Sequence, residues 1–140
     1  MAAKLQTQSV ARSSYVNFLQ KAAECRRAAA RSLAREDWNA ATICAIHGSI
    51  SACDALCAYA LGLRHSGRHH DDAASLLLSI KPSDDRFKAN ATRLRRIIDI
   101  KNMAEYEERL VFRKEAEKAF SHCERFVDFV LSELPQRDNP

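Results

Sequence analysis

Apolar residues recur at spacings of three and four along most of the chain, and little in the sequence interrupts that rhythm. The 140 residues include only 3 glycines and 3 prolines. A sheet protein needs frequent turns and β-branched strands, whereas this spacing places side chains on one face of a helix. The sequence therefore predicts an all-α protein of a single domain, which is long enough to bury a hydrophobic core.

Four main helices and one short helix are expected, with short connections that favour an antiparallel up-and-down bundle. Residues 1–12 are expected to form a flexible N-terminal arm, residues 13–134 the bundle and residues 135–140 a flexible C-terminal tail. The expected helices run from a cap at Ser13 or Ser14 to Arg35, from a cap at Asp37 to about Leu63, from Ala73 to Ile80, onward from a cap at Ser83 or Asp84, and from about Leu110 to Leu134.

The second helix carries two apolar stripes side by side. Two stripes require contact on two sides, so this helix either lies at the centre of the bundle or also faces a second subunit. Its small residues would let neighbouring backbones come close: Ala41, Ala45, Gly48, Ser49 and Ala52. The stripes are Ile43, Ile46, Ile50, Cys53, Cys57 and Ala60, and Ala45, Ser49, Ala52, Leu56, Tyr59 and Leu63.

A polar line made of Cys44, His47, Ser51 and Asp54 runs along the remaining face of that helix. A second polar set, Lys101, Asn102, Glu105 and Tyr106, continues the fourth helix beyond its apolar stripe of Phe87, Ala91, Leu94 and Ile98. A buried Asp54 or Lys101 would be costly alone, so we expect the two polar sets to pack together. The arrangement is either a structural network or the lining of a small polar cleft.

Charge is modest, with a net value of +4, and permits an acidic partner without requiring one. Arg27 and Arg31 lie one helical turn apart on the first helix, and Arg93 and Arg96 lie on the fourth. Such residues form either a solvated face or a phosphate-binding stripe.

The segment between residues 64 and 72 is expected to be a surface loop, and it holds His65, His69, His70, Asp71 and Asp72. Adjacent histidines in a loop with glycines lack the rigid geometry of a metal site, so we expect no metal there. We expect Asp71 or Asp72 to cap the short helix instead. With so few glycines, no phosphate-binding loop can be written, and no cofactor is expected.

Five cysteines, without a Cys-x-x-Cys pair and without an apolar leader, favour reduced thiols and a cytoplasmic location. No apolar run approaches the length of a membrane span. Cys25, Cys53, Cys57 and Cys123 fall on core stripes, where burial keeps a thiol protonated. Cys44 precedes His47 by three residues, but nothing in the sequence completes a catalytic group around it.

The chain resembles the HEPN superfamily of small all-α domains, which includes RNA-cleaving toxins. The resemblance rests on the first helix with Tyr15 and Cys25, on the alanine-rich segment Ala45 to Asp54, and on Lys101-Asn102. Active HEPN ribonucleases carry Arg, a polar residue such as Asn, three variable residues and His. The matching positions here are Lys101, Asn102 and Tyr106. A tyrosine hydroxyl is a poor base at neutral pH, so the resemblance implies a degenerate motif.

The resemblance implies a homodimer that is non-catalytic and binds RNA or a nucleotide in a polar cleft. Lys101, Asn102 and Tyr106 would line that cleft, supported by Arg27, Arg31, Arg93 and Arg96. The alternative is a metal-independent ribonuclease in which His47 replaces the missing histidine and Asp54 orients the helix face. A third possibility is a toxin-like subunit that works with a nucleotidyltransferase antitoxin.

Overall fold

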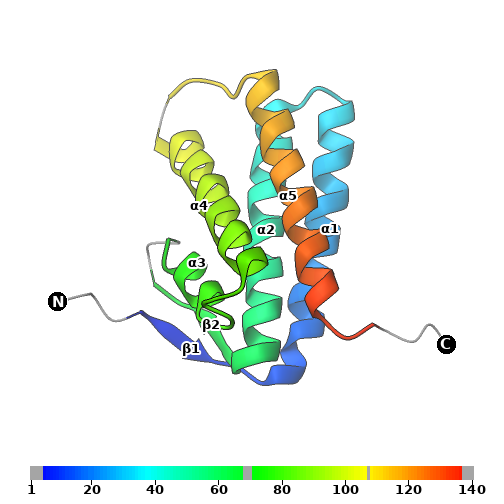
Figure 1. Ribbon diagram of the computed structural model, residues 1–140. Coiled ribbons are helices and arrows are strands. Elements are labelled where there is room, and N and C mark those ends of the chain that lie inside the picture. Colours follow the sequence, from blue (N-terminus) through cyan, green and yellow to red (C-terminus); the bar gives the residue numbers. More distant parts are fainter. Residues whose placement is uncertain (1–4, 68–70, 107, 137–140) are drawn as a thin grey trace.

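The computed structural model describes residues 5–67, 71–106 and 108–136, which form an all-α bundle (Figure 1). The long helices alternate in direction, and the short helix lies between the second and third long helices, so the predicted architecture is confirmed. The helices are α1 (Tyr15–Ala34), α2 (Trp38–Leu61), α3 (Asp71–Leu78), α4 (Asp85–Tyr106) and α5 (Arg113–Glu133).

Helix α2 is the centre of the bundle, because it contacts each of the other four helices. Most of its two apolar stripes is thus buried inside one chain, as at Ile46 and Leu56. The prediction is wrong at Ile43 and Tyr59, which are exposed. Among the described residues α2 is the one helix long and apolar enough to cross a membrane, and 67% of that apolar stretch is buried in the bundle. Such burial is what the core helix of a soluble protein shows.

The backbone of α2 packs closely against its neighbours at Gly48, as its small residues predict. A Cβ atom at this position would lie 3.3 Å from Cys25 Cβ on α1 and 3.5 Å from Cys123 Sγ on α5. Three helices therefore meet around one glycine, and a larger side chain would push them apart.

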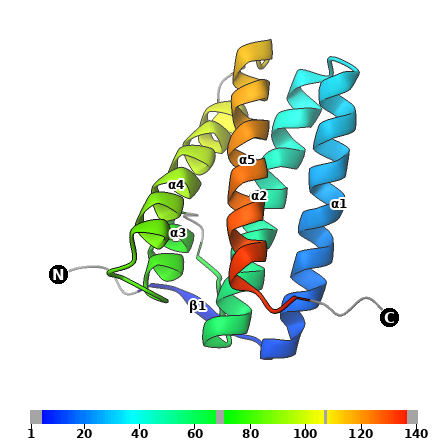
Figure 2. The same ribbon diagram turned by 45° about the vertical axis from the view of Figure 1, so that its right-hand side comes forward.

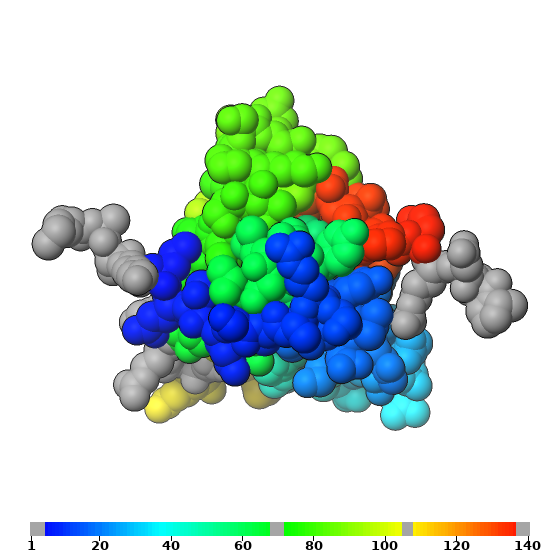
Figure 3. Space-filling model, turned by 90° about the horizontal axis from the view of Figure 1, so that it is seen from below, coloured from blue at the N-terminus to red at the C-terminus, as the bar shows by residue number. Residues whose placement is uncertain are grey.

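The expected loose arm is wrong for part of the N-terminal segment. Thr7–Ser9 forms strand β1, which pairs antiparallel with strand β2, Leu63–His65. A 3-10 turn, η1 (Arg12–Ser14), then leads into α1. Figure 3 shows this segment, in blue, lying across the lower end of the bundle. Paired backbone groups, together with the amide of Val10 bonded to the carbonyl of Gly62 at 3.0 Å, hold it there.

The expected surface loop after α2 is corrected by the same pairing. His65 belongs to β2 and is buried, with 7% of its surface exposed. Burial lowers the pKa of His65, which disfavours the charged form. His69 and His70 lie outside the described residues. Within the described part of the chain, no group of three potential metal ligands is present.

The predicted helix caps are partly confirmed. Asp84 Oδ1 accepts the amide hydrogen of Phe87 at 3.0 Å and caps α4. Neither Ser14 nor Asp37 makes a side-chain cap bond, so these two predictions are wrong. Ser14 has helical backbone angles because it is the last residue of η1, whereas a capping residue needs a non-helical conformation.

The predicted core stripe of α4 is confirmed, since Phe87, Ala91, Leu94 and Ile98 are at most 1% exposed. For the last helix the spacing predicts a stripe of Phe112, Ala116, Ala119, Cys123, Phe126 and Val130. It is buried from Ala116 to Val130, but the prediction is wrong at Phe112. Phe112 is 64% exposed because it precedes the helix and has extended backbone angles.

All five cysteines are free thiols. Cys53, Cys57 and Cys123 are buried, while Cys25 and Cys44 are half-buried. Burial raises the pKa of Cys25 and Cys123, and the hydrogen bond between Cys53 and Cys57, followed by burial, raises that of Cys53. These three thiols are therefore protonated at neutral pH.

Candidate functional site

The two polar sets expected to meet are brought together at one point. His47 of α2 and Lys101 of α4 line the same small cavity, of about 120 Å³. Its other walls are apolar and consist of Ile43, Ile46 and Ala104. His47 is exposed, and Lys101 is half-buried.

Asp54 does not join His47 and Lys101, which corrects the single-network expectation. Its carboxylate is buried and lies 3.4 Å from the guanidinium of Arg64 on β2. Burial raises the pKa of Asp54 to about 6, and the charges of Arg64 and Lys21 oppose that shift. Asp54 lies two helical turns beyond His47 on α2, which places it near the lower end of the bundle. Its partner there is Arg64 of β2.

The remaining residues of the predicted cleft are spread over the molecule. Asn102 is exposed, and the side chain of Tyr106 lies outside the described residues. Arg27 and Arg31 are exposed on α1. Helices α1 and α4 lie on opposite sides of the bundle in Figures 1 and 2, so these arginines form a solvated face away from Lys101.

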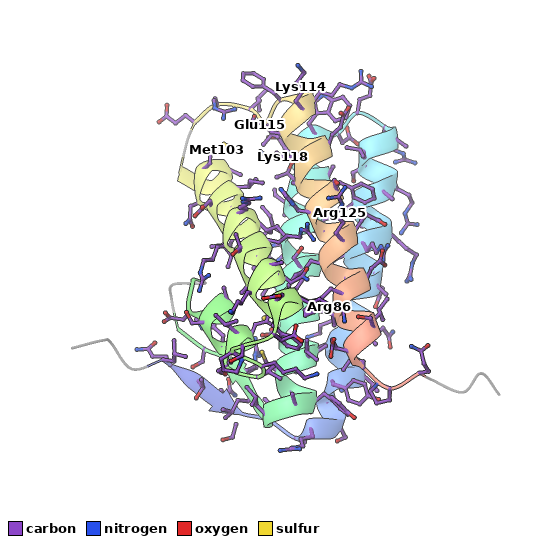
Figure 4. All side chains as sticks on the ribbon, viewed as in Figure 1. Arg86, Met103, Lys114, Glu115, Lys118 and Arg125 are labelled. Atoms are coloured by element: carbon purple, nitrogen blue, oxygen red, sulfur yellow. The ribbon has the colours of Figure 1, made fainter. Side chains whose placement is uncertain are left out.

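A larger hollow lies on the other side of α4, between α4 and α5. It has a volume of about 360 Å³, and we call it the α4/α5 groove. Figure 4 labels Met103 on α4 and Glu115, Lys118 and Arg125 on α5. The lining residues of the groove are Arg96, Asp99, Ile100 and Met103 from α4, and Glu115, Lys118 and His122 from α5.

Basic side chains converge on His122 of this groove. Burial lowers the pKa of His122, and the charges of four neighbours lower it further. Burial also lowers the pKa of Arg93, and the positive charges of Arg125 and Arg96 lower it further by smaller amounts. Arg96, Lys118 and His122 line the groove together, and the charges of Arg93 and Arg125 act on His122 from beside it, so we call these five residues the cationic cluster. The four neighbours of His122 are Arg93, Lys118, Arg96 and Arg125.

Two carboxylates line the groove, and one of them is already neutralised. Glu115 accepts two hydrogen bonds from Arg109, at 2.7 and 2.6 Å, and one from the amide of Phe112 at 2.9 Å. These bonds lower the pKa of Glu115 to about 2. Asp99 is the other carboxylate in the lining, and it is exposed. With Glu115 paired to Arg109, the lining holds two cations, Arg96 and Lys118, against the one remaining carboxylate of Asp99.

Two nitrogen atoms of the cluster are buried and have no hydrogen-bond partner in the described part of the chain: Arg93 Nε and His122 Nε2. Arg93 reaches Asn90 Oδ1 only at 3.5 Å, through Nη1. Buried polar atoms in folded proteins almost always have a partner. Both atoms are closed to solvent, so they offer no contact to a ligand in the open groove.

Three residues of the cluster were missed by the sequence analysis, which considered the last helix only for its apolar stripe. Lys118, His122 and Arg125 are separated by four and three residues, the spacing that places side chains on one helix face. That signal was available. The proximity of Arg93 and Arg96 on α4 was not, because it depends on how the helices pack.

Comparisons with known proteins identify no relative. No family model matches the chain, and neither a curated protein nor a solved structure matches it. The HEPN resemblance therefore stays a prediction from sequence motifs.

Proposed function

We propose that this protein binds RNA or a nucleotide through phosphate groups held in the α4/α5 groove. The observation that supports this function best is that Arg96, Lys118 and His122 line one open hollow, with the charges of Arg93 and Arg125 close to His122. Arg93 and Arg96 belong to both the predicted binding set and this cluster. Lys101 and Asn102 lie outside the groove lining, so the ligand would bind on a different face of α4 from the one that lines the cavity of His47.

The chemistry of the cluster suits a phosphate ligand. A guanidinium group offers several planar donors that match phosphate oxygens, and an ammonium group adds a point charge. Clustered like charges raise the free energy of the empty site, and an anion relieves that cost. A hollow of about 360 Å³ is within the range of small-molecule sites.

The test is binding of a fluorescent nucleotide and of a labelled single-stranded RNA, measured by anisotropy at low salt. The double variant Arg96→Gln/Lys118→Gln should lose affinity by about tenfold or more, because two charge-assisted contacts are removed. The matched control is Arg27→Gln/Arg31→Gln, which also removes two charges but from the solvated face of α1. Absence of binding at low salt would refute the proposal, and equal losses in both variants would reduce it to non-specific charge attraction.

Metal-independent RNA cleavage is the second candidate function. It is favoured by the presence of His47 and Lys101 in one cavity, where an imidazole base and a cation would act on the same phosphodiester. Asp54 does not support it, because its carboxylate is paired with Arg64. Incubation with total RNA and a chelator, comparing wild type with His47→Ala, separates a degenerate domain from an active one.

A homodimer remains part of the proposal, together with a cytoplasmic location and a nucleotidyltransferase partner. The two-sided contact of α2 is satisfied within the chain, so the dimer now depends on the HEPN resemblance and on Ile43, which is 50% exposed on α2. Light scattering at micromolar concentration should give the mass of two chains. Co-purification with the product of a neighbouring gene would support the partner.

A further inference from the structure

We infer that a second copy of this chain binds to an exposed face of α2, in an antiparallel arrangement that places Asp37 of one copy opposite His47 of the other. This surface, which we call the α2 face, consists of Asn39, Ala40, Ile43 and His47. The inference names the surface of the proposed homodimer, so it rests on that part of the proposed function and not on the phosphate ligand.

The α2 face is exposed along the first half of the helix, whereas its continuation along the second half is buried. Ile43 is 50% exposed, and Asn39, Ala40 and His47 are also exposed. Two turns beyond His47, on the same side of the helix, only 8% of the Asp54 side chain is exposed. Strand β2 and helix α3 contact α2, and Figure 1 shows α3 beside the lower half of the bundle. The upper half of α2 lacks this cover.

Two hollows lie next to each other along the α2 face, and their walls are mainly apolar. One is the cavity of about 120 Å³ beside Ile43, and the other, of about 440 Å³, reaches from Ala40 to Leu110. Ala40 and Ile43 are one helical turn apart. Leu110 is 73% exposed, and the amide of Val111 next to it donates to Asn39 Oδ1 at 3.0 Å. Exposed Ile43 and Leu110 gain free energy when another apolar surface covers them.

The two ends of the α2 face carry complementary polar groups. Glu36 and Asp37 line the larger hollow just before α2 begins, while His47 and Lys101 line the smaller cavity. The charges of Glu36 and Arg113 attract each other within the chain. The Asp37 carboxylate makes no cap bond and has no ion pair in the described part of the chain. Asp37 is therefore available to a partner that presents a cation or an imidazole N–H.

An antiparallel pair related by a two-fold axis uses these features twice. When Ala40 of one copy lies opposite Ile43 of the other, the axis passes between them, and the small alanine lets the two helices approach closely. His47 then lies about 8 Å from the axis along α2, at the level of the turn before α2 in the other copy. That turn contains Asp37. One contact thus has an apolar centre and two identical polar pairs at its ends, as a two-fold interface requires.

The first test replaces the centre of the α2 face and measures the dissociation constant of the dimer by sedimentation equilibrium. Ile43→Glu should weaken self-association by about tenfold or more, because it places a charge in the apolar centre of each copy. The matched control is Leu131→Glu on α5, where the leucine is 40% exposed and outside the α2 face. It should leave the constant within about twofold. Circular dichroism confirms that each variant is folded.

Charge reversal tests the pairs at the two ends. Asp37→Lys and His47→Glu should each weaken the dimer by about tenfold or more, because each change places like charges opposite one another. The combined variant should return to within about threefold of the wild-type constant, because opposite charges face each other again.

Three results would overturn the inference in distinguishable ways. A monomer at every concentration refutes the proposed homodimer together with the inference, and leaves the phosphate proposal to its own binding test. A dimer that keeps its strength in Ile43→Glu leaves the homodimer standing and refutes its placement on the α2 face. Failure of the combined variant to recover refutes the antiparallel pairing of Asp37 with His47.

Discussion

The carboxylate of Asp54, buried in the last third of α2, lies 3.4 Å from the guanidinium of Arg64 on β2. Only 8% of the Asp54 side chain is exposed, compared with 37% for Arg64. The ion pair thus joins the central helix to the short strand that also holds the N-terminal segment. The burial cost is only partly offset, since the pKa of Asp54 is raised to about 6.

We predict that stability falls as the pH rises through the titration range of Asp54. Its folded-state pKa of about 6 exceeds the ordinary 3.8, so the folded protein holds the proton more tightly than the unfolded chain. Below about pH 4 both states are protonated, and above about pH 6 the folded state carries a buried charge. Asp54→Asn should remove this loss, on the order of 2–3 kcal/mol. Urea unfolding of both proteins at pH 4 and pH 7.5 measures it. An equal stability difference at the two pH values would contradict the prediction.

Arg26 is predicted to stabilise the contact between α1 and α5. Its Nε donates to Glu124 Oε1 at 2.9 Å, and Nη1 lies 3.0 Å from Asp128 Oδ1. Because both sides are partly exposed, Arg26→Met should cost only about 1 kcal/mol at neutral pH. Arg26 lowers the pKa of Glu124, so its contribution is lost as the pH falls and that carboxylate is protonated. Urea unfolding at two pH values tests this, with Arg27→Met as the exposed neighbouring control.

Gly48 is predicted to tolerate no large side chain. Gly48→Leu should lower the free energy of unfolding by about 1–3 kcal/mol or more, because a Cβ already meets Cys25 Cβ at 3.3 Å. The control is Ala40→Leu, an exposed position on the same helix. Thermal unfolding would contradict the close-packing argument if the two variants had the same midpoint.

The thiols are predicted to react in two groups. Cys25 and Cys44 are half-buried and should be labelled first in the native protein, whereas Cys53, Cys57 and Cys123 should wait for unfolding. Time-resolved labelling with a thiol reagent and mass spectrometry follows each site. In denaturant all five should react. Rapid native labelling of Cys123 would show that the meeting point of α1, α2 and α5 opens readily.

RNA binding is predicted to weaken steeply with salt. The logarithm of the association constant should fall linearly with the logarithm of salt concentration, with a slope of about 0.7 for each phosphate contact to a single strand. Arg96→Gln/Lys118→Gln should therefore reduce the slope by about 1.4. Anisotropy titrations across a salt series measure it, and an unchanged slope would place the phosphates elsewhere.

The sequence was sufficient to predict the bundle, because helix formation and the choice of the buried face depend on local spacing. The stripe from Phe87 to Ile98 and the small residues near Gly48 are confirmed. Strand β1 was missed because three polar residues gain their order only from backbone bonds to β2. Phe112 was wrongly predicted to be buried, because an apolar residue just before a helix can fit the spacing of its apolar stripe without belonging to the helix.

The candidate site shows where sequence reasoning stops. Lys118, His122 and Arg125 share a helix face by spacing alone. Whether that face contacts solvent, carboxylates or further cations depends on which helix packs beside it and on how the two helices are shifted along their axes. The sequence by itself determined the helices, their buried faces and their alternating order, through interactions between near neighbours. Only the tertiary structure decided that Arg93 and Arg96 face those residues, that Asp54 pairs with Arg64 and that His47 lies beside Lys101. Those relationships join residues distant in the chain, and their energies depend on burial and charge that exist only once the helices have packed.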